Sequence, residues 1–193
     1  WEAGQRLMLR RAMQFIAAHI HNLGASGHIV DKIELDTEFV EAMRHVLRHP
    51  GLDAAYKELV LTLPSESYIA EQLPSADPQV VHSVREGMRE QLAAYLHAEW
   101  AWAFEAHQNN GSYTPSGVGS GRRALANMAL SMLCLNARET LDEVWPGKAY
   151  QRFKDAANMT DRLGALTALV HSGHHLAAPA LARFHSLFAG EAL

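Results

Sequence analysis

The chain has 193 residues, 48% of them hydrophobic and 20% charged, which is typical of a globular protein that buries a core as one domain over residues 1–193. The 17 basic and 21 acidic residues give a formal net charge of −4, which excludes the clustered positive surface that nucleic-acid binding needs. No stretch approaches the ~20 apolar residues that cross a bilayer, and the single cysteine, Cys134, excludes an internal disulfide.

Helical periodicity dominates the first part of the chain. Apolar residues recur at spacings of three and four, and the breaks fall at glycine and proline. Asp36 and Ser65 each offer an N-cap oxygen, and Asp77-Pro78 places such an acceptor before a proline in the first turn. The pattern predicts five helices, at residues 7–24, 37–49, 53–61, 65–73 and 78–107.

The second part continues in the same way after a Gly/Ser/Pro-rich loop predicted at residues 109–120. Five further helices are expected, at residues 121–135, 139–144, 150–157, 160–170 and 179–188, with Pro146-Gly147 as a breaker. No alternating run of β-branched residues predicts a strand. The sequence therefore predicts an all-α fold, an irregular α-solenoid of antiparallel helix pairs without a fixed repeat length.

The densest group of possible metal ligands is His171-Ser172-Gly173-His174-His175. On a continuous helix His171 and His175 would share a face and could meet a metal ion. Gly173, however, lies at the predicted helix end, and no glutamate lies within the group. We therefore expect solvated histidines at a helix C-terminus and assign no metal ligand.

Other motifs carry no catalytic chemistry either. His97-Ala98-Glu99 has the H-x-E spacing of zinc deaminases but lacks the paired cysteines. Glycines 117, 119 and 121 precede a helix as in a phosphate-binding turn, but Arg122 stands where a glycine is needed, so a flexible capping loop is expected. Cys134 lies on an apolar face and is predicted to be buried and unreactive.

Asn110 and Asn158 fit the glycosylation pattern but are better interpreted as turn residues. Trp100 and Phe104 share an apolar helix face and are expected in the core. Trp102 lies nearly opposite and predicts a contact with a partner.

Four segments, in order, resemble the C-terminal helical domain of the bacterial aminopeptidase N family, which are gluzincin metallopeptidases. They are residues 1–5, 61–66, 121–127 and 158–166, the last being close to the family's N-M-T-D-x-L-x-A-L. Family members remove N-terminal residues from peptides with one zinc ion held by H-E-x-x-H and a downstream glutamate. Those motifs and the amine-binding G-x-M-E-N are absent from this sequence.

The resemblance implies a non-catalytic, truncated lid: the front part of a superhelical domain that closes over the upstream catalytic domain of the same polypeptide, in a cytoplasmic enzyme acting on peptides. No catalytic, substrate-binding or metal residue is assigned to this chain, and the start at Trp1 fits a fragment. The alternative is a standalone helical-repeat scaffold that binds protein partners, and a His-rich metal-binding domain is a third interpretation. Near a helix start, Arg122 and Arg123 oppose the dipole, so at least one is expected to find a carboxylate or carbonyl partner.

Overall fold

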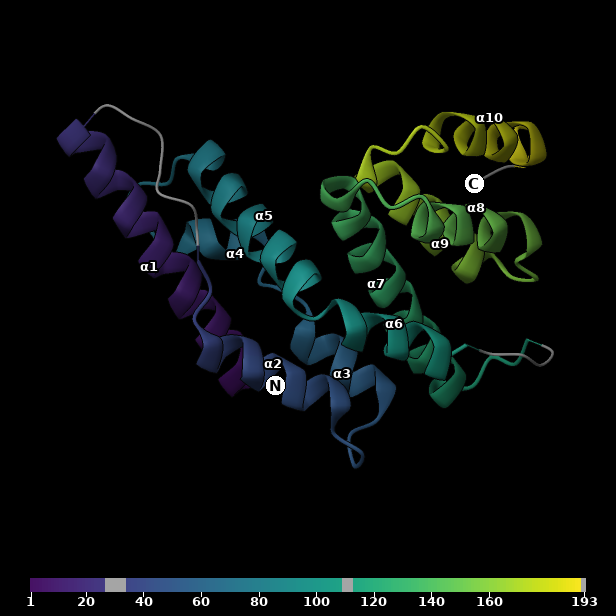
Figure 1. Ribbon diagram of the computed structural model, residues 1–193, viewed down its shortest axis with the longest axis horizontal. Helices are drawn as coiled ribbons and strands as arrows, with labels where there is room; N and C mark the ends of the chain where they lie inside the picture. Colours follow the sequence, from purple (N-terminus) through teal and green to yellow (C-terminus); the bar gives the residue numbers. More distant parts are fainter. Residues whose placement is uncertain (27–33, 109–112, 192–193) are drawn as a thin grey trace. The chain divides into compact units, whose positions relative to one another are not determined.

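The structure, a computed structural model, describes residues 1–26, 34–108 and 113–191 (Figure 1). Within these ranges every regular element is a helix, which confirms the all-α prediction. The helices are α1 (Glu2–Ser26), α2 (Thr37–Arg48), α3 (Ala54–Leu61), α4 (Glu66–Glu71), α5 (Pro78–Tyr95), α6 (His97–Ala106), α7 (Gly117–Thr140), α8 (Val144–Asp155), α9 (Met159–Ser172) and α10 (Ala177–Phe188). No helix in the described ranges is long and apolar enough to cross a membrane.

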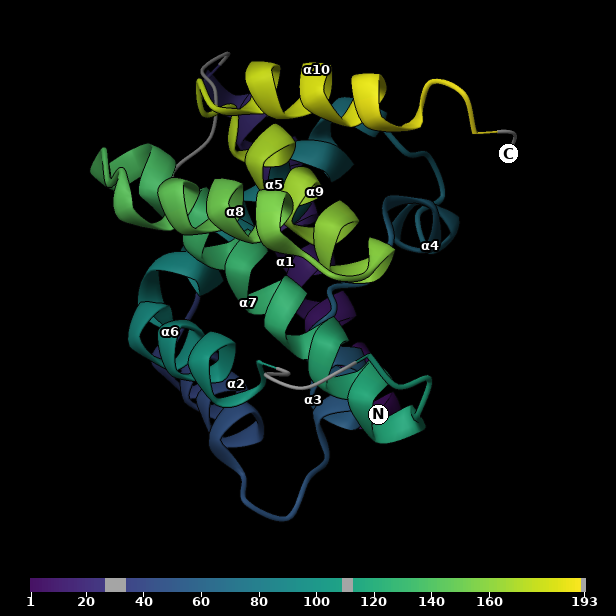
Figure 2. The same cartoon turned by 90° about the vertical axis from the view of Figure 1, so that its right-hand side faces the viewer.

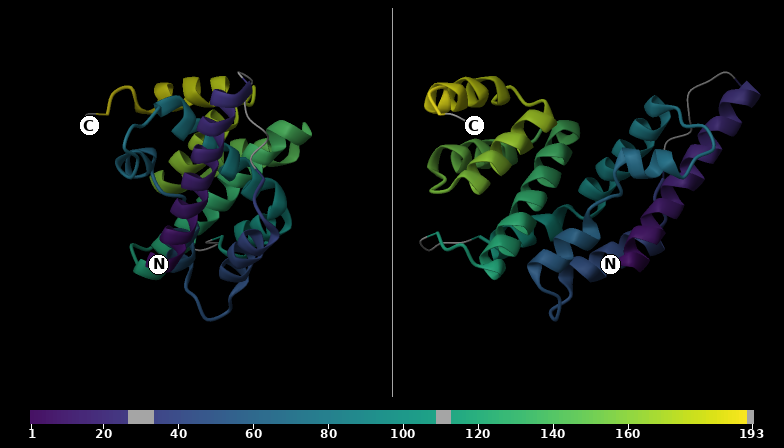
Figure 3. Two further views of the ribbon diagram at one scale, coloured as in Figure 1. Left: turned by 90° about the vertical axis from the view of Figure 1, so that its left-hand side faces the viewer. Right: turned by 180° about the vertical axis from the view of Figure 1, so that it is seen from behind.

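The helices form two compact units. The first comprises Trp1–Leu52 and Tyr56–Tyr95, and the second comprises Asp53–Ala55 and Leu96–Leu193. In the first unit α1 packs along α5 and α4, as Figure 3 shows. In the second unit α9 contacts α7, α8 and α10 (Figure 2), and α6 packs on α7.

Helix caps in the first unit lie where the sequence predicts them. The Asp36 carboxylate accepts a hydrogen bond from the Phe39 amide at 2.9 Å, and its other oxygen pairs with Arg11 at 2.6 Å. Ser65 caps α4 through the Tyr68 amide. The buried apolar residues of α1, α2, α4 and α5 include Met8, Ile16, Phe39, Leu47, Ile69, Met88 and Leu92.

The predicted single helix over residues 78–107 is wrong, because it is divided at Leu96. This residue has φ −108° and ψ 22°, outside the helical range, and its carbonyl begins α6 by accepting from the Trp100 amide at 2.8 Å. The Leu96 side chain is fully buried. A break of one apolar residue leaves the hydrophobic pattern intact and needs neither proline nor glycine, so the sequence gives no signal of it.

The predicted flexible loop before α7 is also wrong over residues 117–120, which are helical. Ser116 is the N-cap and accepts from the Gly119 amide at 3.1 Å. A Cβ on Gly121 would lie 2.8 Å from Ala55 Cβ, so this glycine permits a close approach between α7 and the start of α3. Residues 109–112 of the predicted loop, including Asn110, lie outside the described residues.

Three details of the second unit correct the sequence prediction. No helix spans residues 139–144, since α7 runs to Thr140 and Leu141 follows with φ 56°. Pro146 lies in the first turn of α8, where its missing N–H costs no hydrogen bond, so Pro146-Gly147 does not break the helix. Asn158 caps α9, because its side chain accepts from the Asp161 amide at 2.9 Å, so the helix begins one residue before the predicted range of 160–170.

Candidate functional site

The second unit carries a pocket of about 750 Å³ lined by residues of α6, α7, α8 and α9 and by Tyr113. Four cationic side chains line it, Arg122, Arg123, Lys148 and Arg152, together with the carboxylates of Glu105, Asp155 and Asp161. We call this feature the charged pocket. Most of its charges are already paired: Lys148 contacts Glu105 at 2.9 Å, and Arg152 contacts Asp161 at 2.9 Å.

Arg122 and Arg123, adjacent in the first turns of α7, behave differently. Arg122 donates to the carbonyls of Ala106 and Gln108, at 2.9 and 3.2 Å, which stabilises the C-terminal end of α6 and confirms the predicted carbonyl partner. Arg123 is 5% exposed, and its guanidinium lies over the Tyr113 ring at 4.8 Å. Its Nε is buried without a hydrogen-bond partner among the described residues. Arg123 is thus nearly buried, with its guanidinium against an aromatic ring and its Nε unsatisfied within the described part of the chain.

The start of α9 closes one side of the charged pocket with a buried polar cluster. The Asp161 carboxylate accepts from Arg152 on one oxygen and from the Asn158 amide on the other, each at 2.9 Å. The side chains of Arg152 and Asp161 are only 13% and 14% exposed, so the pair stays largely desolvated. Arg152 also lies 5.5 Å from the Phe104 ring centroid. This cluster fixes the turn between α8 and α9.

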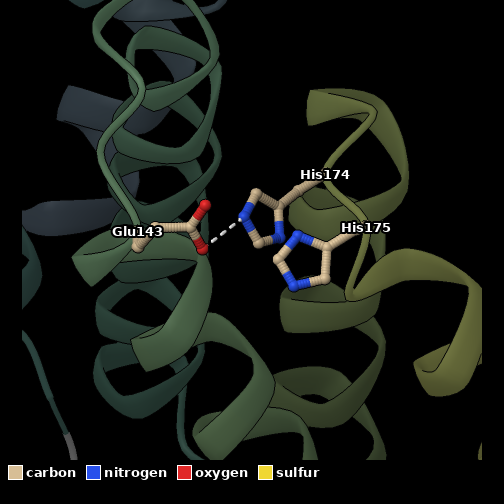
Figure 4. A group of neighbouring side chains, drawn as sticks. All are labelled: Glu143, His174 and His175. Atoms are coloured by element: carbon tan, nitrogen blue, oxygen red, sulfur yellow. Dashed lines mark hydrogen bonds and ion pairs between the residues drawn. The ribbon is translucent and has the colours of Figure 1, made fainter.

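A second group of polar side chains lies elsewhere in the second unit. Glu143, His174 and His175 each offer one ligand atom, and these atoms lie within 4.8 Å of one another. Figure 4 shows the three side chains pointing toward each other from two separate turns. The His174 Nε2 lies 2.9 Å from a Glu143 carboxylate oxygen, and the His174 side chain is 14% exposed against 70% for Glu143.

Helix ends determine where these three side chains lie. α7 ends at Leu141 in the left-handed region, and the next residues turn back into α8 with Glu143 at its N-cap. α9 ends at Ser172 and is capped by Gly173, whose φ of 69° favours glycine. The Gly173 amide donates to the Val170 carbonyl. Because α9 packs on both α7 and α8, the two turns lie together.

The structure changes the composition of the histidine group that the sequence singled out. Its helix ends at Ser172, so His171 and His175 do not share a continuous helix face, and His171 is not in the group of possible ligands. Glu143 takes part instead, although it lies 31 residues before His174. No glutamate lies next to the histidines in the chain, and no local pattern around Glu143 indicates this contact.

The other residues singled out in the sequence pack in or near the core of the second unit. Cys134 is fully buried, which confirms the predicted burial, and this burial, with Asp142 as a smaller cause, raises the pKa of its thiol to about 12. The His97 and Trp145 rings pack edge to face, with their centroids 6.3 Å apart. Trp100 and Phe104 are core residues, as predicted, whereas Trp102 is 36% exposed.

Comparison with known proteins gives consistent matches. Residues 1–193 match a protein-family model, DUF3458_C, which is described as a domain of unknown function with ARM repeats. Aminopeptidase N of Caulobacter vibrioides is 28% identical over 194 residues, which cover 100% of this chain and 21% of that protein. Aminopeptidase N of Escherichia coli is 28% identical over 170 residues, covering 88% of this chain and 18% of that protein. The chain therefore spans about a fifth of the length of these relatives.

A solved structure shows the same fold. The aminopeptidase A of Legionella pneumophila, crystallised in complex with aspartic acid, superposes with a TM-score of 0.76 at 22% identity, over 98% of this chain and 21% of that one. The ARM-repeat match and this superposition support the predicted solenoid-like helical class, and the aminopeptidase N matches support the resemblance read from the four sequence segments. This chain belongs to the DUF3458_C ARM-repeat domain family, in a region shared with the C-terminal parts of aminopeptidases N.

Proposed function

We propose that this chain is the helical part of a zinc-dependent aminopeptidase that removes N-terminal residues from peptides, and that it helps to enclose the active site as a lid. The observation that carries the proposal is the 28% identity to an aminopeptidase N over the whole of this chain. The matched region is only 21% of that aminopeptidase. A part of this size, without a catalytic motif of its own, acts through the protein that contains it.

The catalytic zinc of the family does not fit this chain. The sequence holds no H-E-x-x-H, and the Glu143, His174 and His175 group comes from two inter-helix turns rather than from one helix face. We therefore assign the zinc ligands and the general base to the catalytic domain upstream, the expected partner of this chain. No catalytic step is assigned to residues 1–193.

Two features support a role in enclosure. Nearly buried at the wall of the charged pocket, Arg123 has no carboxylate partner among the described residues, and we propose that a group from outside this chain supplies one. In the first unit, Leu59 and Tyr68 are 47% and 46% exposed beside a groove of about 770 Å³. Exposed apolar side chains at a groove are typical of a contact surface. A lid that covers an active site excludes water and large substrates.

The test uses the full-length protein that contains this chain. We expect it to release N-terminal residues from short peptides, and we expect a zinc chelator to abolish this activity. For the lid, Arg123→Met should alter kcat/KM for longer peptides more than for a small aminoacyl anilide. Arg183→Met, which removes an exposed arginine of α10, is the matched control.

Absence of peptidase activity from a correctly folded, zinc-loaded protein would refute the proposed function. It would favour the alternative, a scaffold that binds proteins through an exposed aromatic face, for which the partly exposed Trp102 is the supporting observation. Equal effects of Arg123→Met and Arg183→Met on both substrates would refute the lid role while leaving the peptidase assignment intact. We also propose a cytoplasmic location, as the resemblance implies, and cell fractionation checks it.

A further inference from the structure

Glu143, His174 and His175 bring together two imidazoles and one carboxylate, a ligand set that binds zinc-like transition metals. The three ligand atoms lie within 4.8 Å of one another, whereas neighbouring ligands of a tetrahedral zinc ion are about 3.4 Å apart. Glu143 is the member that can adjust its position, because its side chain is 70% exposed and makes no capping hydrogen bond at the start of α8.

His174 is the fixed member of the group. Its amide donates to the Ser172 hydroxyl at 3.3 Å, and that buried hydroxyl donates to the Leu169 carbonyl at 2.8 Å. Its Nδ1 accepts from the Leu176 amide at a long 3.3 Å, and its Nε2 faces Glu143. A metal ion at Nε2 moves the ring proton to Nδ1, so the Leu176 amide loses its acceptor and the ring must turn away from that amide. The Glu143 carboxylate then contacts the metal ion in place of the imidazole proton.

Three other polar groups lie around the site. It opens to a pocket of about 220 Å³ that is also lined by Cys134, Arg138 and Asp142, and the Arg138 guanidinium pairs with the Glu139 carboxylate at 3.1 Å. The Cys134 thiol stays protonated at neutral pH, because burial raises its pKa to about 12, so it supplies no thiolate. The Asp142 carboxylate accepts from the Val144 amide at 2.7 Å and holds the turn that carries Glu143. Three protein ligands leave one position for water.

We propose that Glu143, His174 and His175 form a binding site for a divalent transition-metal ion of the zinc type, which joins the α7–α8 turn to the α9–α10 turn. This proposal concerns residues of this chain alone and is independent of the peptidase function. A metal ion that binds only the folded unit stabilises it, and the gain grows with the logarithm of the free ion concentration once that concentration exceeds the Kd.

The direct test titrates the metal-free 193-residue chain with Co²⁺ and then with Zn²⁺, once circular dichroism has shown that it is helical. We expect one ion per chain and the visible absorption of tetrahedral Co²⁺, lost on adding Zn²⁺. Glu143→Gln, His174→Ala and His175→Ala should each weaken the apparent Kd by at least about ten-fold. The matched controls are His171→Ala on α9 and His185→Ala on α10, both exposed histidines outside the group, and they should leave the Kd unchanged.

Failure to bind one ion, or an equal loss of affinity in the His171→Ala control, would overturn the proposal. If the isolated chain does not fold, the metal content of the full-length protein decides instead. There, the Glu143→Gln/His174→Ala variant should hold one ion fewer than the wild type and keep its peptidase activity. An unchanged metal content would overturn this site while leaving the proposed function standing. Absence of peptidase activity in the wild type, together with one ion fewer in the variant, would refute the proposed function and leave this metal site standing.

Discussion

Gly164 on α9 and Gly147 on α8 allow one substitution to be compared in two surroundings. A Cβ on Gly164 would lie 2.5 Å from both Cγ and Nδ2 of Asn127 on α7, closer than real Cβ contacts. A Cβ on Gly147 meets nothing within 4 Å. Replacing either glycine with alanine favours the helical backbone by about 1 kcal/mol, so the surroundings decide the sign of the change in stability.

For Gly164→Ala the unfavourable contributions are larger. Asn127 must move away from the new methyl group and lose the hydrogen bond from its Nδ2 to the Thr160 carbonyl at 3.2 Å, which contributes about 1 kcal/mol. Inserting a methyl group into a filled contact costs a further ~1–3 kcal/mol. After the gain in helix propensity, we expect a net loss of about 1–3 kcal/mol in the free energy of unfolding, which lowers Tm by about 2–12 °C. Gly147→Ala should raise stability by about 0.5–1 kcal/mol.

Urea and thermal unfolding followed by circular dichroism measure both variants against the wild type. A third variant, Gly164→Ala/Asn127→Ala, should recover part of the lost stability, because the clashing side chain is gone. If Gly164→Ala is as stable as Gly147→Ala, or if removing Asn127 recovers nothing, then the close approach of α9 to α7 does not limit this position.

Three further predictions concern single side chains of the second unit. Asp161→Asn should lower the free energy of unfolding by about 3 kcal/mol, since it leaves the largely buried Arg152 cation unpaired; adding Arg152→Met should restore much of that loss in a double-mutant cycle. Arg122→Ala should lower Tm by about 2–4 °C, because the last carbonyls of α6 lose a charged donor, and an unchanged Tm would contradict this role. Cys134 should resist a thiol reagent at pH 8 until denaturant is added, and fast labelling of the native protein would contradict its burial. Above its ordinary pKa of 9.0 the unfolded thiol ionises while the folded one stays protonated to about 12, so the wild type should lose stability relative to Cys134→Ala as pH rises through that range.

The local sequence determined the helical class and most helix starts. Asp36, Ser65 and Asp77 cap the helices that their positions predict, because an N-cap acts within three residues of itself. Apolar spacing likewise identified the buried faces, including Trp100 and Phe104. It failed at Leu96, where one non-helical residue preserves the apolar stripe, and near Gly117, where glycines expected in a loop lie in a helix.

Tertiary packing decided which distant side chains meet. Three contacts join residues that lie at least fourteen positions apart in the chain. They are the contact of Glu143 with His174, the approach of Gly164 to Asn127, and the hydrogen bond of Arg122 to the Gln108 carbonyl. The position of Arg122 and Arg123 near a helix start predicts a carboxylate or carbonyl partner, but it does not predict that the partner is the Ala106 carbonyl at the end of α6. Periodicity reports which face of a helix is apolar and does not report which helix covers it. The sequence by itself therefore determined the fold class and the family resemblance, while the packing of α9 on α7 and α8 determined the charged pocket and the candidate metal site.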